Sequence, residues 1–309
     1  MPKQANNLMT SANTTAIAPK RIGRFDQLLS LLPFGFGENN PVIAVLRLDG
    51  VIGKIGMTKS GMTMKDLNKL IEKTFKIDKL EAVCLVINSP GGSPVQSDLI
   101  AKRITTLAKE KDIKIFGFVE DVAASGGYWL ACAADEIYAS HSSIIGSIGV
   151  ISSGFGFHEA IKKLGIERRV HTEGKTKSVL DPFKPSRDSD VKIIKKIQKE
   201  IHQHFIDTVK ERRSGRLTQS DDILFNGEFW TGQIALDYGL IDGIGDMYSF
   251  IQKKYGDKVK IEYIENKQSW IKKKLGMASL SKEFTSDFAD SLVDSLEQKI
   301  AYNKFDIAQ

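Results

Sequence analysis

The feature that most constrains this chain is the alternation of continuous apolar runs with segments of helical character. The apolar runs predict strands over 42–48, 82–88, 114–120 and 136–140. The segments between and after them predict helices over 64–75, 96–109, 125–134 and 189–213. Strands that are apolar throughout are buried on both faces, and their alternation with helices is typical of parallel sheets. The sequence therefore predicts an α/β fold with mostly parallel strands and flanking helices.

The patterning divides the chain into three regions. Residues 1–40 are predicted to be a partly disordered N-terminal extension with a short amphipathic segment over 25–37, which could lie on a membrane surface or pack against protein. Residues 41–265 hold the alternating pattern and form the predicted folded domain. Residues 266–309 are predicted to be a charged, helical C-terminal tail.

The composition is that of an ordinary globular protein. The 309 residues are 41% hydrophobic, which excludes disorder throughout the chain. The net charge of +6 is modest for this length, and no basic run is interleaved with aromatic residues. Solvated lysine-rich helix faces therefore explain the charge better than nucleic-acid binding does. The two cysteines, Cys84 and Cys132, sit in apolar stretches and are predicted to be buried free thiols.

No segment of the sequence has the pattern of a membrane anchor. The first segment, 1–21, lacks the apolar core of a secretory signal peptide. The longest uncharged run, 137–157, is long enough to span a bilayer, but it is rich in serine and glycine, which suits buried strands and turns. We therefore expect neither a signal peptide nor a transmembrane helix.

Two glycine-marked loops follow predicted strands and so lie at the carboxyl edge of the sheet, where open α/β folds bind ligands. In NSPGGSP, over 88–94, Gly91 and Gly92 leave backbone N–H groups free to face an oxyanion, although a tight turn alone explains this loop better. In AASGGY, over 123–128, Ser125 could be a helix N-cap or a nucleophile. Small neighbours, the helix N-terminus and the Gly126 N–H favour the nucleophile.

A serine nucleophile needs a base. The chain has five histidines, and none lies in a motif that suggests a catalytic triad. Two of them, His202 and His204, fall on the charged helix and are expected to be exposed. The other candidate base is a lysine held neutral by burial, as in Ser–Lys enzymes. With 44 lysines and arginines, composition alone selects no particular lysine.

Five motifs together resemble the signal peptide peptidase A family, the S49 serine peptidases. They are NSPGGSP at 88–94, ASGGYWLACAAD at 124–135, SIIGSIGVI at 143–151, GKTKS at 174–178 and GEFWTGQIALDYGLID at 227–242. Each motif alone is weak, but in this order they are specific. The resemblance covers residues 42–246 and implies a fold related to Clp protease and the crotonases, with residues 41–265 as the peptidase domain.

The resemblance implies a catalytic dyad. The family places its nucleophile in the SGGY motif, which is Ser125 here, and its general base in a G-x-x-K segment, which selects Lys177. A shift of two residues would select Lys175 instead, but the motif register favours Lys177. The lysine would take the hydroxyl proton, an acyl-enzyme would form, and water would release the product. The implied enzyme is a serine endopeptidase that cleaves signal peptides or other apolar peptides without a metal or cofactor.

The remaining site residues implied by the resemblance support this dyad. Ser147, in the GSIGV motif, would hydrogen-bond the lysine and orient it. Gly91 or Gly92, together with Gly126, would supply N–H groups to the oxyanion. The resemblance to short family members implies a ring of subunits. We therefore expect a homo-oligomer with sites near subunit interfaces, in which the lysine reaches the serine of its own or of the next subunit.

Other functions remain open on the same fold. A crotonase-like acyl-CoA enzyme would have similar oxyanion loops but would use carboxylates, and a non-catalytic scaffold would be free to lose either dyad residue. The expected partners are peptide substrates and other copies of the chain, with peripheral membrane contact and without nucleic acid. The resemblance implies a bacterial protein located in the cytoplasm or at the periphery of the inner membrane.

Overall fold

A computed structural model describes residues 40–55 and 59–265 of the chain. The predicted N-terminal extension and C-terminal tail lie outside these residues, apart from Asn40, so the three-part division of the chain stays a prediction. None of the helices among the described residues is both long and apolar enough to cross a membrane.

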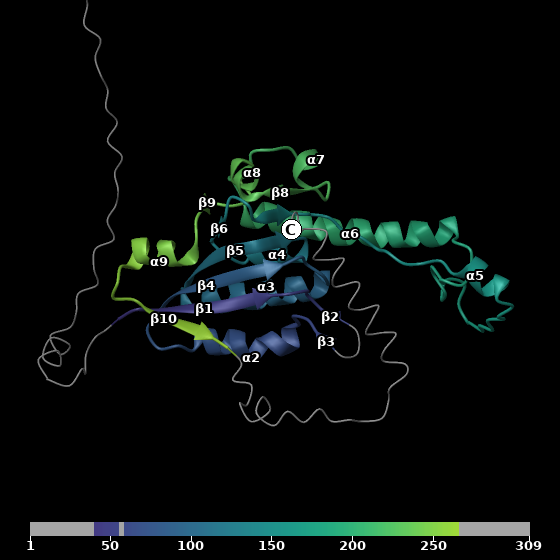
Figure 1. The fold of residues 1–309 in the computed structure, drawn as a ribbon, viewed down its shortest axis with the longest axis horizontal. Helices are drawn as coiled ribbons and strands as arrows, with labels where there is room; N and C mark the ends of the chain where they lie inside the picture. Colours follow the sequence, from purple (N-terminus) through teal and green to yellow (C-terminus); the bar gives the residue numbers. More distant parts are fainter. Residues whose placement is uncertain (1–39, 56–58, 266–309) are drawn as a thin grey trace, which may run out of the picture. The chain divides into compact units, whose positions relative to one another are not determined.

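The described part of the chain is built on one mostly parallel sheet (Figure 1). Its strand order is β10 (Lys260–Ile264), β1 (Val42–Asp49), β4 (Leu80–Ser89), β5 (Lys114–Ala124), β6 (Glu136–Ala139) and β9 (Gly243–Ile244), and each neighbouring pair is parallel. The last residues of β5 also pair in parallel with β7 (Ile144–Gly146). In turn, β7 pairs antiparallel with β8 (Phe229–Thr231). A small separate hairpin joins β2 (Lys54–Ile55) and β3 (Lys59–Ser60). The predicted α/β class with mostly parallel strands is confirmed.

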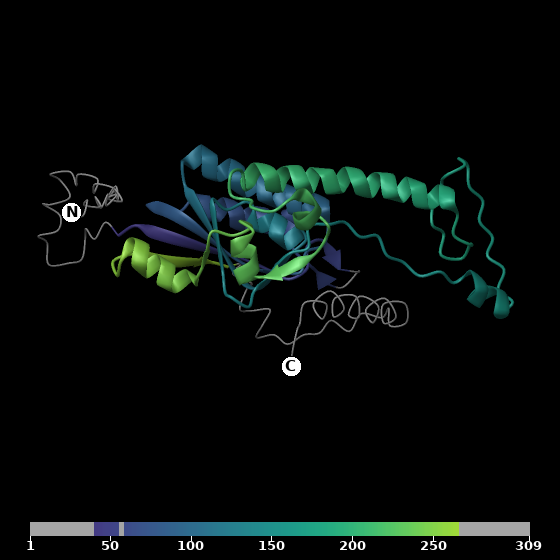
Figure 2. The same ribbon diagram turned by 90° about the horizontal axis from the view of Figure 1, so that it is seen from above.

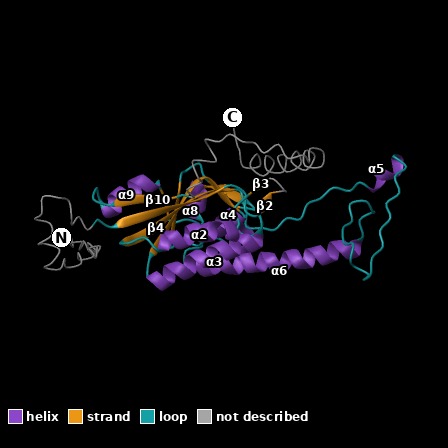
Figure 3. Cartoon of the chain, turned by 90° about the horizontal axis from the view of Figure 1, so that it is seen from below, coloured by secondary structure: helices purple, strands orange, loops and turns teal. Residues whose placement is uncertain are grey.

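Helices cover the two faces of the sheet unequally, as Figures 2 and 3 show. The first face packs against α2 (Met64–Phe75), α3 (Pro94–Lys111), α4 (Gly126–Ala131) and α6 (Asp188–Arg212). On the second face lies α9 (Met247–Tyr255), whose Phe250 contacts Phe116 and Phe118 of β5. Because side chains alternate along a strand, Ala44 and Leu46 of β1 face the first layer while Ile43 and Val45 face the second.

Most predicted elements are found within a residue or two of their predicted ends. The largest difference is β5, which continues to Ala124 instead of ending at Glu120, because residues 122–124 pair with β7. The helix predicted over 125–134 is shorter, because Ser125 has a non-helical backbone and residues 132–134 form turns. Neither β10 nor α9 was predicted, because both lie after the last of the sequence motifs.

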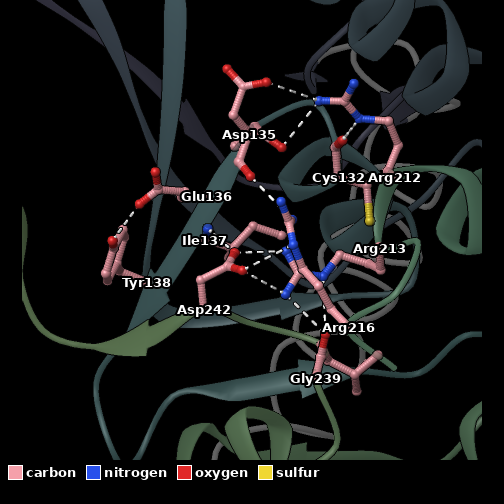
Figure 4. A network of polar contacts seen from close by, with 12 residues as sticks. Cys132, Asp135, Glu136, Ile137, Tyr138, Arg212, Arg213, Arg216, Gly239 and Asp242 are labelled. Carbon is pink, nitrogen blue, oxygen red and sulfur yellow. Dashed lines mark hydrogen bonds and ion pairs between the residues drawn. The ribbon is translucent and has the colours of Figure 1, made fainter. Parts of the chain in front are cut away.

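A buried network fixes the ends of α4 and α6 to each other (Figure 4). Arg212 donates hydrogen bonds to the carbonyls of Cys132, Ala133 and Ala134 at 2.7–3.1 Å, and so satisfies acceptors in the turn that directly follows α4. Next to it, Arg213 is 1% exposed and forms two hydrogen bonds with the carboxylate of Asp242 at 2.6 and 3.1 Å. The network therefore holds α4 at the end opposite to Ser125.

The long connection between β7 and α6 consists mostly of exposed residues. We call residues 151–187 the arm, and it contains the short helix α5 (His158–Lys163). Two further helices, α7 (Asp221–Leu224) and α8 (Gly232–Asp237), follow α6 and are not part of the arm. Figures 2 and 3 show α5 beyond the N-terminal end of α6, away from the sheet. Residues 151–157 are all exposed, with Ile151 84% and Phe155 74% exposed. Among the apolar residues of α6, only Phe205 and Val209 are buried.

Candidate active site

Ser125 occupies the turn between β5 and α4 in an unusual backbone conformation. Its φ of 53° and ψ of −122° are costly for a residue with a Cβ atom. The turn is held by two backbone hydrogen bonds, in which the Ser125 N–H donates to the Gly146 carbonyl at 2.7 Å and the Trp129 N–H donates to the Ser125 carbonyl at 3.1 Å. The half-buried Ser125 side chain does not cap α4, and its hydroxyl bonds to no residue in the described ranges. The N-cap role considered for Ser125 is therefore not the one it has.

The loop over 88–94 packs directly on this serine. A Cβ atom on Gly91 would lie 2.8 Å from the Ser125 Cβ and 2.8 Å from the Gly126 nitrogen, and the φ of Gly91 is +104°. Ile52 ties the loop from its other side, since its N–H donates to the Gly91 carbonyl and its carbonyl accepts from the Ser93 N–H, both at 2.8 Å. The two glycine-marked loops predicted at the carboxyl edge therefore meet at Ser125.

The backbone N–H groups of Gly91 and Gly92 differ in their hydrogen bonding. The Gly91 N–H donates to the Ser89 hydroxyl oxygen at 3.2 Å, and that hydroxyl donates to the Gly50 carbonyl at 2.7 Å. Within the described part of the chain, the N–H groups of Gly92 and Gly126 donate to nothing. The Gly92 nitrogen lies 3.3 Å from the position that a Cβ on Gly126 would take. Two free donors thus stand beside Ser125, and the Gly91 N–H is not one of them.

Ser147 lies next to Ser125 on the neighbouring strand. It follows β7, whose last residue Gly146 is the register partner of Ala124 at the end of β5. Its φ of 52° matches that of Ser125, its N–H donates to the Glu228 carbonyl at 2.7 Å, and it is buried. Among residues 40–55 and 59–265, none accepts from or donates to its hydroxyl. A buried hydroxyl without a partner is costly and points to a group that arrives from elsewhere.

The structure does not bring the predicted base to this serine within one chain. Lys177 lies on the arm, is exposed, and has its backbone N–H bonded to the Gly174 carbonyl at 3.1 Å. Its amine contacts no described residue by hydrogen bond or ion pair. Lys175 is exposed as well. Within the described chain, the geometry therefore joins Ser125, Ser147 and the glycines, and neither candidate lysine forms a hydrogen bond or ion pair with them.

Histidines do not supply an alternative base in the described chain. His204 is exposed, as predicted, and contacts Asp98 at 3.3 Å. The prediction for His202 was wrong, because this side chain is half-buried and its Nε2 lies 3.0 Å from the Ile148 carbonyl, one residue after Ser147. No histidine hydrogen-bonds Ser125. The contacts of Ser89 with Gly91 and of His202 with Ile148, both next to predicted site residues, were not predicted, since no sequence motif displays them.

The described residues contain no cluster of three or more histidine, cysteine or acidic side chains that could hold a metal ion. Both cysteines are free and buried, which confirms the prediction made for them.

Comparisons with known proteins point to the same group of enzymes. The family model for peptidase family S49 matches residues 107–260. The chain is 31% identical over 215 residues to "Probable protease SohB" from Buchnera aphidicola subsp. Schlechtendalia chinensis, which corresponds to 69% of this chain and 67% of that protein. It is 30% identical over 210 residues to "Serine protease SPPA, chloroplastic" from Arabidopsis thaliana, with 66% of this chain and 31% of that protein covered.

A further relative carries a different name. The chain is 47% identical over 285 residues to the Na(+)/H(+) antiporter NhaA of Brucella melitensis, which corresponds to 90% of this chain. The chain spans only 39% of the length of that protein.

Proposed function

Because the chain belongs to peptidase family S49, we propose that it is a serine endopeptidase in which Ser125 is the nucleophile and Lys177 the general base. The observation that carries the proposal is the arrangement around Ser125. Its hydroxyl is uncommitted, and the free N–H groups of Gly92 and Gly126 lie beside it. A serine hydroxyl next to paired backbone donors is the arrangement that acyl transfer requires.

The proposed reaction assigns one task to each group. Lys177 accepts the Ser125 proton as the hydroxyl attacks the peptide carbonyl, and the oxyanion accepts hydrogen bonds from Gly92 and Gly126. Protonated Lys177 then donates its proton to the leaving amine, and water hydrolyses the acyl-enzyme. Ser147 accepts a hydrogen bond from the lysine amine, which would satisfy its buried hydroxyl.

We propose further that the lysine comes from a second copy of the chain. The arm that carries Lys177 exposes apolar side chains at Ile151 and Phe155, and α6 beside it exposes Ile197. Apolar surface of this kind is normally buried against another protein. A heterologous contact that repeats around a ring would cover the arm and deliver Lys177 to the neighbouring Ser125.

The proposed substrates are apolar peptides, such as cleaved signal peptides. Val95 and Leu99 lie at the start of α3, directly after the loop that holds Gly92, and are 64% and 44% exposed. An extended apolar peptide bound to the oxyanion donors would meet these side chains. This substrate class also fits the family, whereas an acyl-CoA substrate does not.

Mixing two inactive variants tests the proposal. We expect Ser125→Ala and Lys177→Ala each to abolish cleavage of an apolar fluorogenic peptide, and Lys175→Ala, the matched control, to retain it. A mixture of the two inactive variants, reassembled from dissociated chains, should recover about a quarter of the wild-type activity, because each contact in a random ring draws its serine and lysine independently.

Each result has a distinct meaning. Activity retained by Lys177→Ala would rule out Lys177 as the base. If both variants are inactive and their reassembled mixture gains nothing, the dyad lies within one chain and the shared site is wrong.

A further inference from the structure

The second face of the sheet carries a cavity of about 790 Å³ that includes none of the residues proposed for catalysis. Its floor is apolar and is made by Val45 of β1, Val86 of β4 and Phe118 of β5, with Met247 at the start of α9. These side chains project to the same face as those that α9 covers. With nine residues, α9 is about 14 Å long. The carboxyl-terminal part of this face is therefore left as a hollow.

The charged groups around this cavity are mostly acidic. Glu120, Asp121, Asp246 and Glu265 contribute carboxylates, and the guanidinium of Arg47 is already paired with Glu120. An apolar floor with an acidic rim suits a ligand that combines an apolar or aromatic group with positive charge.

Two tyrosines add an aromatic edge to the same cavity. The hydroxyls of Tyr248 and Tyr263 lie 2.6 Å apart, and these side chains are 62% and 49% exposed. Exposed aromatic rings bind cations through their faces as well as apolar groups. The edge therefore suits the same kind of ligand as the floor and the rim.

A segment with this chemistry begins where the described chain ends. Glu265 lines the cavity, and the next residues read NKQSWIKKKL, with Trp270 and Ile271 followed by lysines at 272, 273 and 274. The five residues from Glu265 to Trp270 can span at most about 18 Å. A segment of this length that starts at Glu265 is kept within reach of the cavity by the chain itself, which gives it a high effective concentration there.

We propose that the cavity is a binding site for a basic, aromatic peptide segment and that residues 266–275 of the same chain occupy it. Trp270 lies on the apolar floor, and the lysines at 272–274 face the acidic rim. The site is separate from the proposed active site and does not depend on the proposed peptidase activity.

Fluorescence of the full-length chain tests this proposal, because Trp270 can be isolated from the other tryptophans. The chain has three, and Trp129 and Trp230 are 2% and 6% exposed. Subtracting the spectrum of Trp270→Phe from that of the wild type gives the emission of Trp270 alone. We expect this emission to be blue-shifted and quenched by acrylamide several-fold less than that of free tryptophan. Emission at the wavelength of free tryptophan, with full quenching, would overturn the proposal.

A larger side chain at position 245 would fill the cavity without straining the backbone. Gly245 lines the cavity, a Cβ atom there would meet nothing within 4 Å, and its φ is not positive. Gly245→Leu should release Trp270 to solvent and restore its quenching, whereas the control Gly245→Ala should leave Trp270 shielded. Circular dichroism establishes that both variants fold. Shielding that persists in folded Gly245→Leu would place Trp270 elsewhere and contradict the proposal.

Charge gives an independent second test. Replacing the three lysines at 272–274 with glutamate should also expose Trp270, since the rim would then repel the segment. Wild-type shielding that disappears on dilution would place the segment in the cavity of another copy and overturn the assignment to the same chain.

Discussion

Ser125 and Ser147 each follow the last residue of one of two paired strands, β5 and β7. Their preceding residues, Ala124 and Gly146, are register partners, and the Ser125 N–H donates to the Gly146 carbonyl at 2.7 Å. Both serines have positive φ, at 53° and 52°. Two adjacent serines in this costly conformation, with hydroxyls that bond to no described residue, indicate a site prepared for another group.

Ser147→Ala should lower kcat of the peptidase by about 10- to 100-fold, because a hydrogen bond to a charged amine contributes about 1.5–3 kcal/mol. It should leave the unfolding midpoint nearly unchanged, since the hydroxyl has no partner in the described chain. Ser143→Ala is the matched control: its hydroxyl is also buried but donates to the Glu120 carbonyl. The control should lose stability and keep kcat. An unchanged kcat in Ser147→Ala would remove Ser147 from the mechanism.

Ser89→Ala should reduce kcat more than it changes KM. The Ser89 hydroxyl joins the Gly91 N–H to the Gly50 carbonyl, and without it the loop that holds the Gly92 donor loses its anchor. The loss of one preorganised oxyanion donor lowers kcat by about 100- to 1000-fold. A donor that is held less firmly should therefore lower kcat by a smaller factor. Steady-state kinetics with the same apolar peptide provide the measurement. If only KM rises, Ser89 supports substrate binding and not the oxyanion.

Arg213→Ala should lower the free energy of unfolding by about 3 kcal/mol or more, because it leaves the Asp242 carboxylate without its main partner in a buried setting. Arg216→Ala is the control, since Arg216 contacts the same carboxylate at 3.5 Å but is 41% exposed. Its cost should be about 1 kcal/mol or less. Urea unfolding of both variants measures the difference, and equal losses would show that burial of the pair is unimportant.

The cysteines should be unreactive in the native protein. Burial raises the pKa of Cys84 to about 12 and that of Cys132 to about 11, so both remain protonated thiols at pH 8. A thiol reagent should modify neither before unfolding and both afterwards. Because these pKa values are raised above the ordinary value of 9.0, their contribution to stability is complete below pH 9 and is lost as the pH rises through 11 and 12. Rapid modification of the native protein at pH 8 would contradict the burial.

The spacing of apolar residues along the sequence predicted most of the fold, because the burial of each strand or helix requires a particular spacing. Strands buried on both faces need unbroken apolar runs, as in β4, and α2 needs apolar residues at helical spacing. Local periodicity is misleading where a long-range strand pairing overrides the local pattern. Glu120 and Asp121 look like the end of a strand, yet β5 continues because β7 pairs with the residues that follow them.

The α/β class, the placement of Ser125 between a strand and a helix, and the family could all be predicted from the amino-acid sequence, because motifs and periodicity are local properties. The folded chain was needed to show that the Gly91 N–H donates to Ser89 while the Gly92 N–H stays free, and that Ser147 lies beside Ser125. Lys177 lies on the exposed arm and makes no contact with the serine within the described chain. The physical reason is that hydrogen-bond partners and burial depend on which distant segments the folded chain brings together.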